Sequence, residues 1–325
     1  MRGIQISFFP YFRFPSPNPL PLERALRRFI NFGFYSTISP ALLHNAGTCN
    51  RRDCSTHHQG NKVIVIFLAS ILLGAVSGLM AGLFGIGGGL VIVPILAVLF
   101  AAEGFPAELV MIMSVATSLA TIVFTSVASV LAHHRLNSVL WDKVLAMGPG
   151  TMVGAAVGAV VADHVSGGVL RFIFIIYLLC MGVQMALQLK PQPGRKPPSK
   201  NLDLGVASLI GLFSSLLGIG GGTLMVPFLV HFQTPMRNAV AIASACGLPI
   251  AVVGSIGYAL LGRDALQLPE WSLGYIYAPS FLGIVLTSMY TASIGAGLAH
   301  KLPAEKLKRY FSLLLFVMAA KLIWF

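Results

Sequence analysis

Long runs of apolar residues alternate with short polar links from residue 62 to the C-terminus. Two of the apolar segments, at about 89–101 and 223–232, would extend only about 15–20 Å as helices, less than the roughly 30 Å hydrocarbon core. We therefore predict half-helices there, within an all-α, polytopic transmembrane protein. Membrane spans are predicted at about 63–84, 107–131, 140–162, 169–188, 203–217, 236–261, 273–298 and 306–325.

The composition supports a membrane setting. Hydrophobic residues make up 56% of the 325 positions and charged residues 10%, whereas soluble domains carry about 25% charged residues. The net charge of +12 does not indicate nucleic acid, because the basic residues gather in the first 61 positions and in links between apolar runs, where they set topology. The lipid bilayer is the predicted partner, and no nucleic-acid partner is expected.

The first 61 residues differ in composition from the rest of the chain. They are rich in Pro, Arg, Ser and Asn, and Glu23 and Asp53 are their acidic residues. Three interpretations stay open: an organelle targeting segment, an extension from a start codon placed too far upstream, and a disordered tail. We leave residues 1–61 out of the fold prediction.

A sequence motif occurs twice. Residues 78–94 read GLMAGLFGIGGGLVIVP and residues 211–227 read GLFSSLLGIGGGTLMVP, and the two align without a gap. This internal repetition predicts a first transmembrane repeat at 62–189, a proline-containing linker at 190–202, and a second transmembrane repeat at 203–325. Duplicated halves are typical of transporters.

Each glycine motif is predicted to turn the chain back to the side from which its half entered the membrane. This arrangement places most lysines and arginines of the repeats on one side, whereas a simple crossing at each motif divides them more evenly. It makes the two halves inverted and places the 190–202 linker in the cytoplasm. A full crossing at each motif is the alternative.

The glycine motifs are the first candidate site. Several glycines in succession are unfavourable inside a helix, and an unwound backbone in a membrane requires cover by protein or a water-filled cavity. A helix that begins after each break would direct unpaired N–H groups and a partial positive charge at an anion. The alternative is that the glycines only allow close helix contacts. The candidate binding residues in the motifs are Gly87, Gly88, Gly89, Gly220, Gly221 and Gly222.

Hydroxyl groups supply the remaining candidates. Thr223 follows the glycines of the second motif, Thr117 and Ser118 lie in the segment SVATSLA, and Ser244 lies at the corresponding place in the second half. These hydroxyls would donate hydrogen bonds to an oxyanion. Other hydroxyls of that face, including Thr121 and Thr125, are expected to bond their own helix or a neighbouring one. No Asp or Glu is predicted deep in a span, which suits the passage of an anion.

The paired motif G-x-G-G-G-x-x-x-V-P, the sequence ATSL and the duplicated organisation resemble the TauE/SafE sulfite exporter family of anion permeases. The resemblance covers about residues 62–325. It implies transport of sulfite, sulfoacetate or related sulfur-containing anions across a plasma membrane. The second half has Ala243, Ser244 and Ala245 where the first has Ala116, Thr117 and Ser118, so the halves differ at the last two of these positions.

The predicted function is a permease for small anions, such as sulfite or an organosulfonate, in which the two repeats expose the site alternately to each side. A channel-like anion conductor and a non-transporting membrane scaffold or assembly factor are the alternatives. We expect no enzyme activity, cofactor or metal site, because the chain has no H-E-x-x-H, C-x-x-C or buried acid pair. The expected location is the plasma membrane, or an organelle membrane if the leader is a targeting segment, and a homo-oligomer is left open.

Overall fold

The computed structural model describes residues 51–84, 88–135, 137–187, 200–265, 267–299 and 304–324. Within it, Thr56–Phe325 form one compact unit. Most of the predicted tail at 1–61, most of the predicted linker at 190–202, and the candidate residue Gly87 lie outside the described residues.

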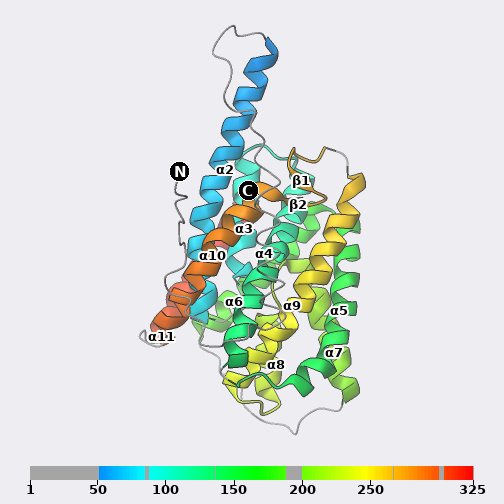
Figure 1. Ribbon diagram of the computed structural model, residues 1–325, viewed down its shortest axis with the longest axis vertical. Coiled ribbons are helices and arrows are strands. Elements are labelled where there is room, and N and C mark those ends of the chain that lie inside the picture. Colours follow the sequence, from blue (N-terminus) through cyan, green and yellow to red (C-terminus); the bar gives the residue numbers. More distant parts are fainter. Residues whose placement is uncertain are drawn as a thin grey trace, which may run out of the picture. The chain divides into compact units, whose positions relative to one another are not determined.

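Helices make up nearly all of the described chain, which confirms the all-α, polytopic class (Figure 1). The first half contains α2 (Arg51–Phe84), α3 (Gly89–Ala102), α4 (Ala107–Arg135), α5 (Trp141–His164) and α6 (Gly167–Ala186). The second half contains α7 (Lys200–Leu217), α8 (Gly222–His231), α9 (Met236–Leu261), the 3-10 turn η1 (Gly262–Asp264), β1 (Ser272–Leu273), β2 (Ile276–Tyr277), α10 (Ala278–Ala299) and α11 (Ala304–Trp324).

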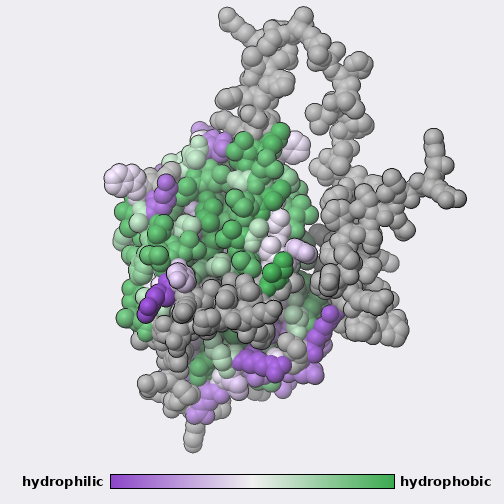
Figure 2. Space-filling model, turned by 90° about the vertical axis from the view of Figure 1, so that its left-hand side faces the viewer, coloured by the Kyte–Doolittle hydropathy of each residue, from purple (hydrophilic) through white to green (hydrophobic). Residues whose placement is uncertain are grey.

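Five helices of the described residues are long and apolar enough to cross a membrane. They are Val63–Ala81, Ala107–Arg135, Trp141–His164, Gly167–Ala186 and Met236–Asp264. Large apolar side chains such as Leu72, Leu145 and Phe172 are exposed on their outer faces. Figure 2 shows a broad hydrophobic surface with hydrophilic residues gathered toward its ends. A surface of this kind is stable against lipid and would be unfavourable in water.

Contacts between distant residues define the two ends of the bundle. At the first end, the Tyr277 ring lies 5.5 Å from Phe100 and 5.3 Å from Phe105, and the Tyr275 hydroxyl donates to Asp163 at 2.7 Å. At the second end, Arg237 Nε donates to Ser138 Oγ at 2.7 Å. The ends of α3 and α5 therefore lie at the first end, and the end of α4 and the start of α9 lie at the second.

Both half-helices return to the end at which their half begins. In α2, Ser70 packs against the start of α10, where its Oγ donates to Ser280 Oγ at 3.0 Å. Because α10 begins at the first end, beside Tyr277, and runs parallel to α2, α2 starts at the end where α3 finishes. At the second end, Lys143 Nζ lies 2.9 Å from Asp203 Oδ2 near the start of α7, and α8 finishes just before α9 begins there. The two halves thus enter from opposite ends, as the returning arrangement requires.

Small residues bring two parallel helix pairs into close contact. In the α5–α7 pair, a Cβ atom added at Gly150 would lie 2.5 Å from the Leu204 carbonyl oxygen. In the α2–α10 pair, a Cβ atom added at Gly78 would lie 2.5 Å from the Ser288 carbonyl oxygen. Small residues have this role in membranes because close backbone approach supplies the packing energy. The contacts agree with a duplicated chain, although the repeat itself stays a prediction from the sequence.

The predicted span at 273–298 is wrong at its beginning. Residues 272–277 form a two-stranded antiparallel hairpin in which Ser272 pairs with Tyr277, and α10 begins at Ala278. Gly274 has a φ of 56° in the turn. Tyr275, Ile276 and Tyr277 are buried, so this apolar segment packs into the end of the bundle as a hairpin.

Candidate functional site

Each half-helix begins directly after a glycine in the left-handed conformation. Gly88 precedes α3 with a φ of 77°, and Gly221 precedes α8 with a φ of 72°. A residue with a Cβ atom would be strained at either position. Neither glycine offers a side chain to cap the helix, so the first N–H groups of both helices depend on other partners.

The two breaks contact each other in the centre of the molecule. A Cβ atom added at Gly89, the first residue of α3, would lie 2.5 Å from the Gly218 carbonyl oxygen and 3.0 Å from Ile219 Cα. Gly220 is packed against a side chain: the Cγ2 atom of Ile122 would lie 3.0 Å from a Cβ atom added at Gly220. Close backbone approach and uncapped helix N-termini therefore occur together at these breaks.

Ser118 contacts the second break directly. Its hydroxyl donates to the Gly218 carbonyl at 2.8 Å. Because Ser118 belongs to α4 and Gly218 to the second half, this bond joins the halves at the breaks. Of the four predicted hydroxyl residues, Ser118 and Thr223 lie at a break.

Thr223 is the second residue of α8 and hydrogen-bonds the hydroxyl of Tyr177 on α6. The sequence prediction did not include Tyr177, because nothing in the surrounding pattern separates it from other aromatic residues of a span. Two hydroxyls thus lie beside the first turn of α8. A hydroxyl can donate to an anion after a small rotation.

Thr117 and Ser244 have other partners. Thr117 Oγ1 accepts a hydrogen bond from the Tyr277 backbone N–H at 3.1 Å, so it holds the 272–277 hairpin onto α4. Ser129 Oγ donates to Ser244 Oγ at 3.1 Å between α4 and α9. Both hydroxyls therefore bond to partners outside the breaks. Other hydroxyls of the α4 face bond their own helix, as expected: Ser114 with Val110 O, Thr121 with Ser118 O and Thr125 with Ile122 O.

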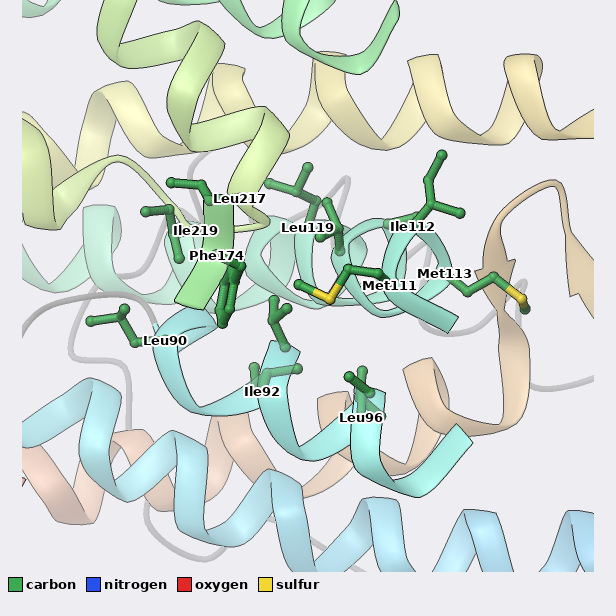
Figure 3. Packing of buried hydrophobic residues seen from close by; sticks show 14 of the residues in the cluster. Leu90, Ile92, Leu96, Met111, Ile112, Met113, Leu119, Phe174, Leu217 and Ile219 are labelled. Carbon is green, nitrogen blue, oxygen red and sulfur yellow. The ribbon is translucent and has the colours of Figure 1, made fainter. Parts of the chain in front are cut away.

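Apolar side chains surround the breaks. Figure 3 shows Phe174, Leu217, Ile219 and Leu90 gathered where α7 ends and α3 begins. All four have at most 2% of their surface exposed. A hydrogen-bond donor in such a low-dielectric environment interacts more strongly with an anion than it would in water.

Two serines before the second break were missed by the sequence prediction. Ser214 and Ser215 are fully buried, and neither hydroxyl has a hydrogen-bond partner among the described residues. The motif alignment contained the signal, since Ser214 and Ser215 stand opposite Ala81 and Gly82. A polar residue in one motif opposite an apolar or glycine residue in the other can indicate a site present in one half alone.

An ion pair lies at one end of the bundle, and a hydrogen bond between a tyrosine and a carboxylate lies at the other. At the second end, Asp203 is 3% exposed and pairs with Lys143, while its Oδ1 atom has no partner in the described structure. At the first end, burial and the hydrogen bond to Asp163 raise the pKa of Tyr275 to about 12. Burial, with the negative charge of Glu103, also raises the pKa of Tyr277.

The fold and the site define a multi-pass helical membrane protein with two helical hairpins whose glycine breaks touch inside the bundle, each break followed by an uncapped helix N-terminus. The family model described as Sulfite exporter TauE/SafE matches residues 70–322. The chain therefore belongs to the TauE/SafE sulfite exporter family.

Curated relatives agree with this assignment. A probable membrane transporter protein from Haemophilus influenzae is 35% identical over 258 residues, which cover 79% of this chain and 98% of the relative. A probable membrane transporter protein from Methanocaldococcus jannaschii is 26% identical and covers 76% of this chain and 92% of the relative. A third, YunE from Bacillus subtilis, is 24% identical, with 79% and 97% covered. No solved structure matches the chain. The family and these relatives are membrane transporters, not enzymes.

Proposed function

We propose that the protein is a permease for small oxyanions, such as sulfite or an organosulfonate, in a cell membrane. The observation that carries the proposal is the contact between the two breaks, where Gly89 at the uncapped start of α3 lies against Gly218, three residues before the uncapped start of α8 at Gly221, in a buried centre. Such N-termini attract an anion through their N–H groups and dipoles, without a basic side chain. Membership of the sulfite exporter family supports a sulfur oxyanion as the cargo.

Transport requires that the site open to each side in turn. The two hairpins enter from opposite ends and touch at Gly89 and Gly218, so a small rotation of one half against the other would separate them toward one end and then the other. This is the alternating access expected of inverted halves around a fixed site. In this proposal, the end that carries Lys143 and Arg237 faces the cytoplasm.

The test is flux of sulfite and of sulfoacetate into sealed proteoliposomes, compared with liposomes from a mock purification. Saturable flux above that control is the expected result. Flux that rises linearly with concentration would instead indicate a channel-like conductor. No flux of either anion by protein shown to be folded would contradict the proposal and favour a scaffold.

Replacement of Gly221 by Val tests the site. The φ of 72° and the Ile250 side chain, whose Cδ1 atom would lie 2.9 Å from an added Cβ atom, together disfavour any side chain there. We expect the variant to insert into membranes but to lose sulfite flux. Gly168, which has nothing within 4 Å of an added Cβ atom, provides the control, and Gly168→Val should transport normally. Equal flux in the two variants would contradict the site assignment.

A further inference from the structure

The hydroxyl of Ser214 lies beside the uncapped start of α8. A Cβ atom added at Gly221, the N-cap position, would lie 3.6 Å from Ser214 Oγ. The Ser214 hydroxyl therefore lies close to where a capping side chain would otherwise be attached. Its backbone is fixed there, because the Ile219 N–H donates to the Ser214 carbonyl at 2.9 Å.

Ser214 has no hydrogen-bond partner within the described part of the chain, although it is fully buried. A buried hydroxyl without a partner destabilises the folded state, and native proteins contain few of them. Such a group calls for an explanation, and a ligand that supplies the missing acceptor is one. Gly221 is followed directly by Gly222 and Thr223, the first two residues of α8, whose amides have no acceptor within the helix.

The first half has no such group. The side chain at the corresponding place, Ala81, has its Cβ atom 3.5 Å from the position of a Cβ atom added at Gly88. Ala81 therefore stands beside the start of α3 as Ser214 stands beside the start of α8. The two N-termini have the same backbone geometry, but only the second is accompanied by a hydroxyl at this position.

We propose that Ser214 binds the transported anion and determines specificity, so that the second break, and not the first, provides the principal binding site. The Ser214 hydroxyl and the amides of Gly222 and Thr223 are three donors, which match the three oxygens of sulfite or of a sulfonate group. This inference rests on the proposed function. The fully deprotonated oxyanion accepts all three hydrogen bonds, and the Ser214 hydroxyl, which has no partner among the described residues, gains one.

The neighbouring residue supplies a matched control. Ser215 is also fully buried and without a partner in the described structure. Its Oγ atom, however, would lie 3.0 Å from a Cβ atom added at Gly254 on α9. It faces a different helix from Ser214, so its hydroxyl is not directed at the start of α8. Ser215→Ala removes the same group, from the same helix, at the same depth of burial.

The experiment compares Ser214→Ala, Ser215→Ala and the unchanged protein in two assays. Without ligand, both variants should unfold at the same temperature as the unchanged protein or a higher one, because each loses a buried hydroxyl that has no partner. In proteoliposomes, Ser214→Ala should raise the half-saturating sulfite concentration about tenfold, as expected for one lost hydrogen bond to a charged ligand. In detergent, sulfite should raise the unfolding temperature of the unchanged protein and of Ser215→Ala, and should raise that of Ser214→Ala much less.

Two results would overturn the inference while leaving the proposed function intact. One is saturable sulfite flux with the same half-saturating concentration in Ser214→Ala and the unchanged protein. The other is an equal change in Ser214→Ala and Ser215→Ala, since a general packing effect would act on both. Absence of saturable flux in the unchanged protein would overturn the proposed function and the inference with it. If Ser214→Ala fails to fold, Ser214→Thr and Ser214→Val provide a second comparison. The two side chains have nearly the same shape, but only threonine keeps the hydroxyl, so Ser214→Thr should bind sulfite more tightly than Ser214→Val.

Discussion

The hydroxyl of Ser118 donates a 2.8 Å hydrogen bond to the carbonyl of Gly218, a residue 100 positions later in the chain. The same carbonyl lies against Gly89 at the start of α3. Two elements of the first half, α4 and α3, therefore converge on one backbone group of the second break. Any movement that separates the halves has to change one or both of these contacts.

Replacement of Ser118 by Ala should destabilise the protein. The variant leaves the buried Gly218 carbonyl without this donor, which costs about 1–3 kcal/mol. The measurement is the thermal unfolding of protein purified in detergent. Ser114→Ala is the control, because Ser114 lies on the same helix and donates to its own helix at Val110. An unfolding temperature for Ser118→Ala equal to that of Ser114→Ala would contradict the structural role of the bond.

Replacement of Gly89 by Ala should force the breaks apart. The added methyl group would lie 2.5 Å from the Gly218 oxygen, and overpacking of this kind costs about 1–3 kcal/mol. Gly205 in α7 has nothing within 4 Å of an added Cβ atom, so Gly205→Ala should instead stabilise its helix by about 0.5–1 kcal/mol. Opposite shifts of the unfolding temperature are therefore expected, and shifts in the same direction would contradict the contact between the breaks.

The half-helices were predictable because their cause is local. A run of glycines ends one helix and a short apolar segment begins the next, so the predicted 89–101 and 223–232 agree closely with Gly89–Ala102 and Gly222–His231. The 272–277 hairpin was not predictable in the same way. Its apolar residues continue into α10 without a polar break, and short apolar runs do not distinguish a strand from a helix.

The hydroxyl partners depend on tertiary packing, which the sequence does not show. Thr117 and Ser118 are neighbours on α4, yet one accepts from Tyr277 and the other donates to Gly218. Successive residues of a helix point about 100° apart, so the two side chains face different elements. Ser214 was missed for the opposite reason: the alignment showed the difference from Ala81, but the absence of a partner emerges only from the packed structure.

The pair formed by Lys143 and Asp203 should show strong energetic coupling. Asp203 is 3% exposed and Lys143 is 29% exposed, so removal of the lysine leaves a buried carboxylate without its counter-charge, at a cost of about 3–5 kcal/mol. Lys143→Met should therefore lower the unfolding temperature strongly. Lys143→Met combined with Asp203→Asn should be more stable than the sum of the two single changes predicts.

A double-mutant cycle measures this coupling. We expect an interaction free energy within the range of about 0.5–3 kcal/mol found for contacting pairs. Additive effects of the two changes would mean that the 2.9 Å ion pair contributes nothing to stability. Because ion pairs on the surface contribute little to stability, the cycle also tests whether the start of α5, which carries Lys143, is buried in the folded protein.

Stability should fall at alkaline pH through Tyr275. Burial and the hydrogen bond to Asp163 raise the pKa of its phenol to about 12, above the value of about 10 in an unfolded chain. The unfolded state therefore loses its proton first, and the contribution of Tyr275 is fully present below about pH 10 and is lost as the pH rises toward 12. Tyr275→Phe should reduce this loss in unfolding temperature between pH 10 and 12. Asp163→Asn should reduce it in part, because removal of the negative charge brings the folded-state pKa of Tyr275 closer to its unfolded value. Tyr277, whose pKa is also raised, should leave part of the alkaline loss in both variants. An identical pH profile in Tyr275→Phe and the unchanged protein would show that the bond between α5 and the hairpin is not formed in solution.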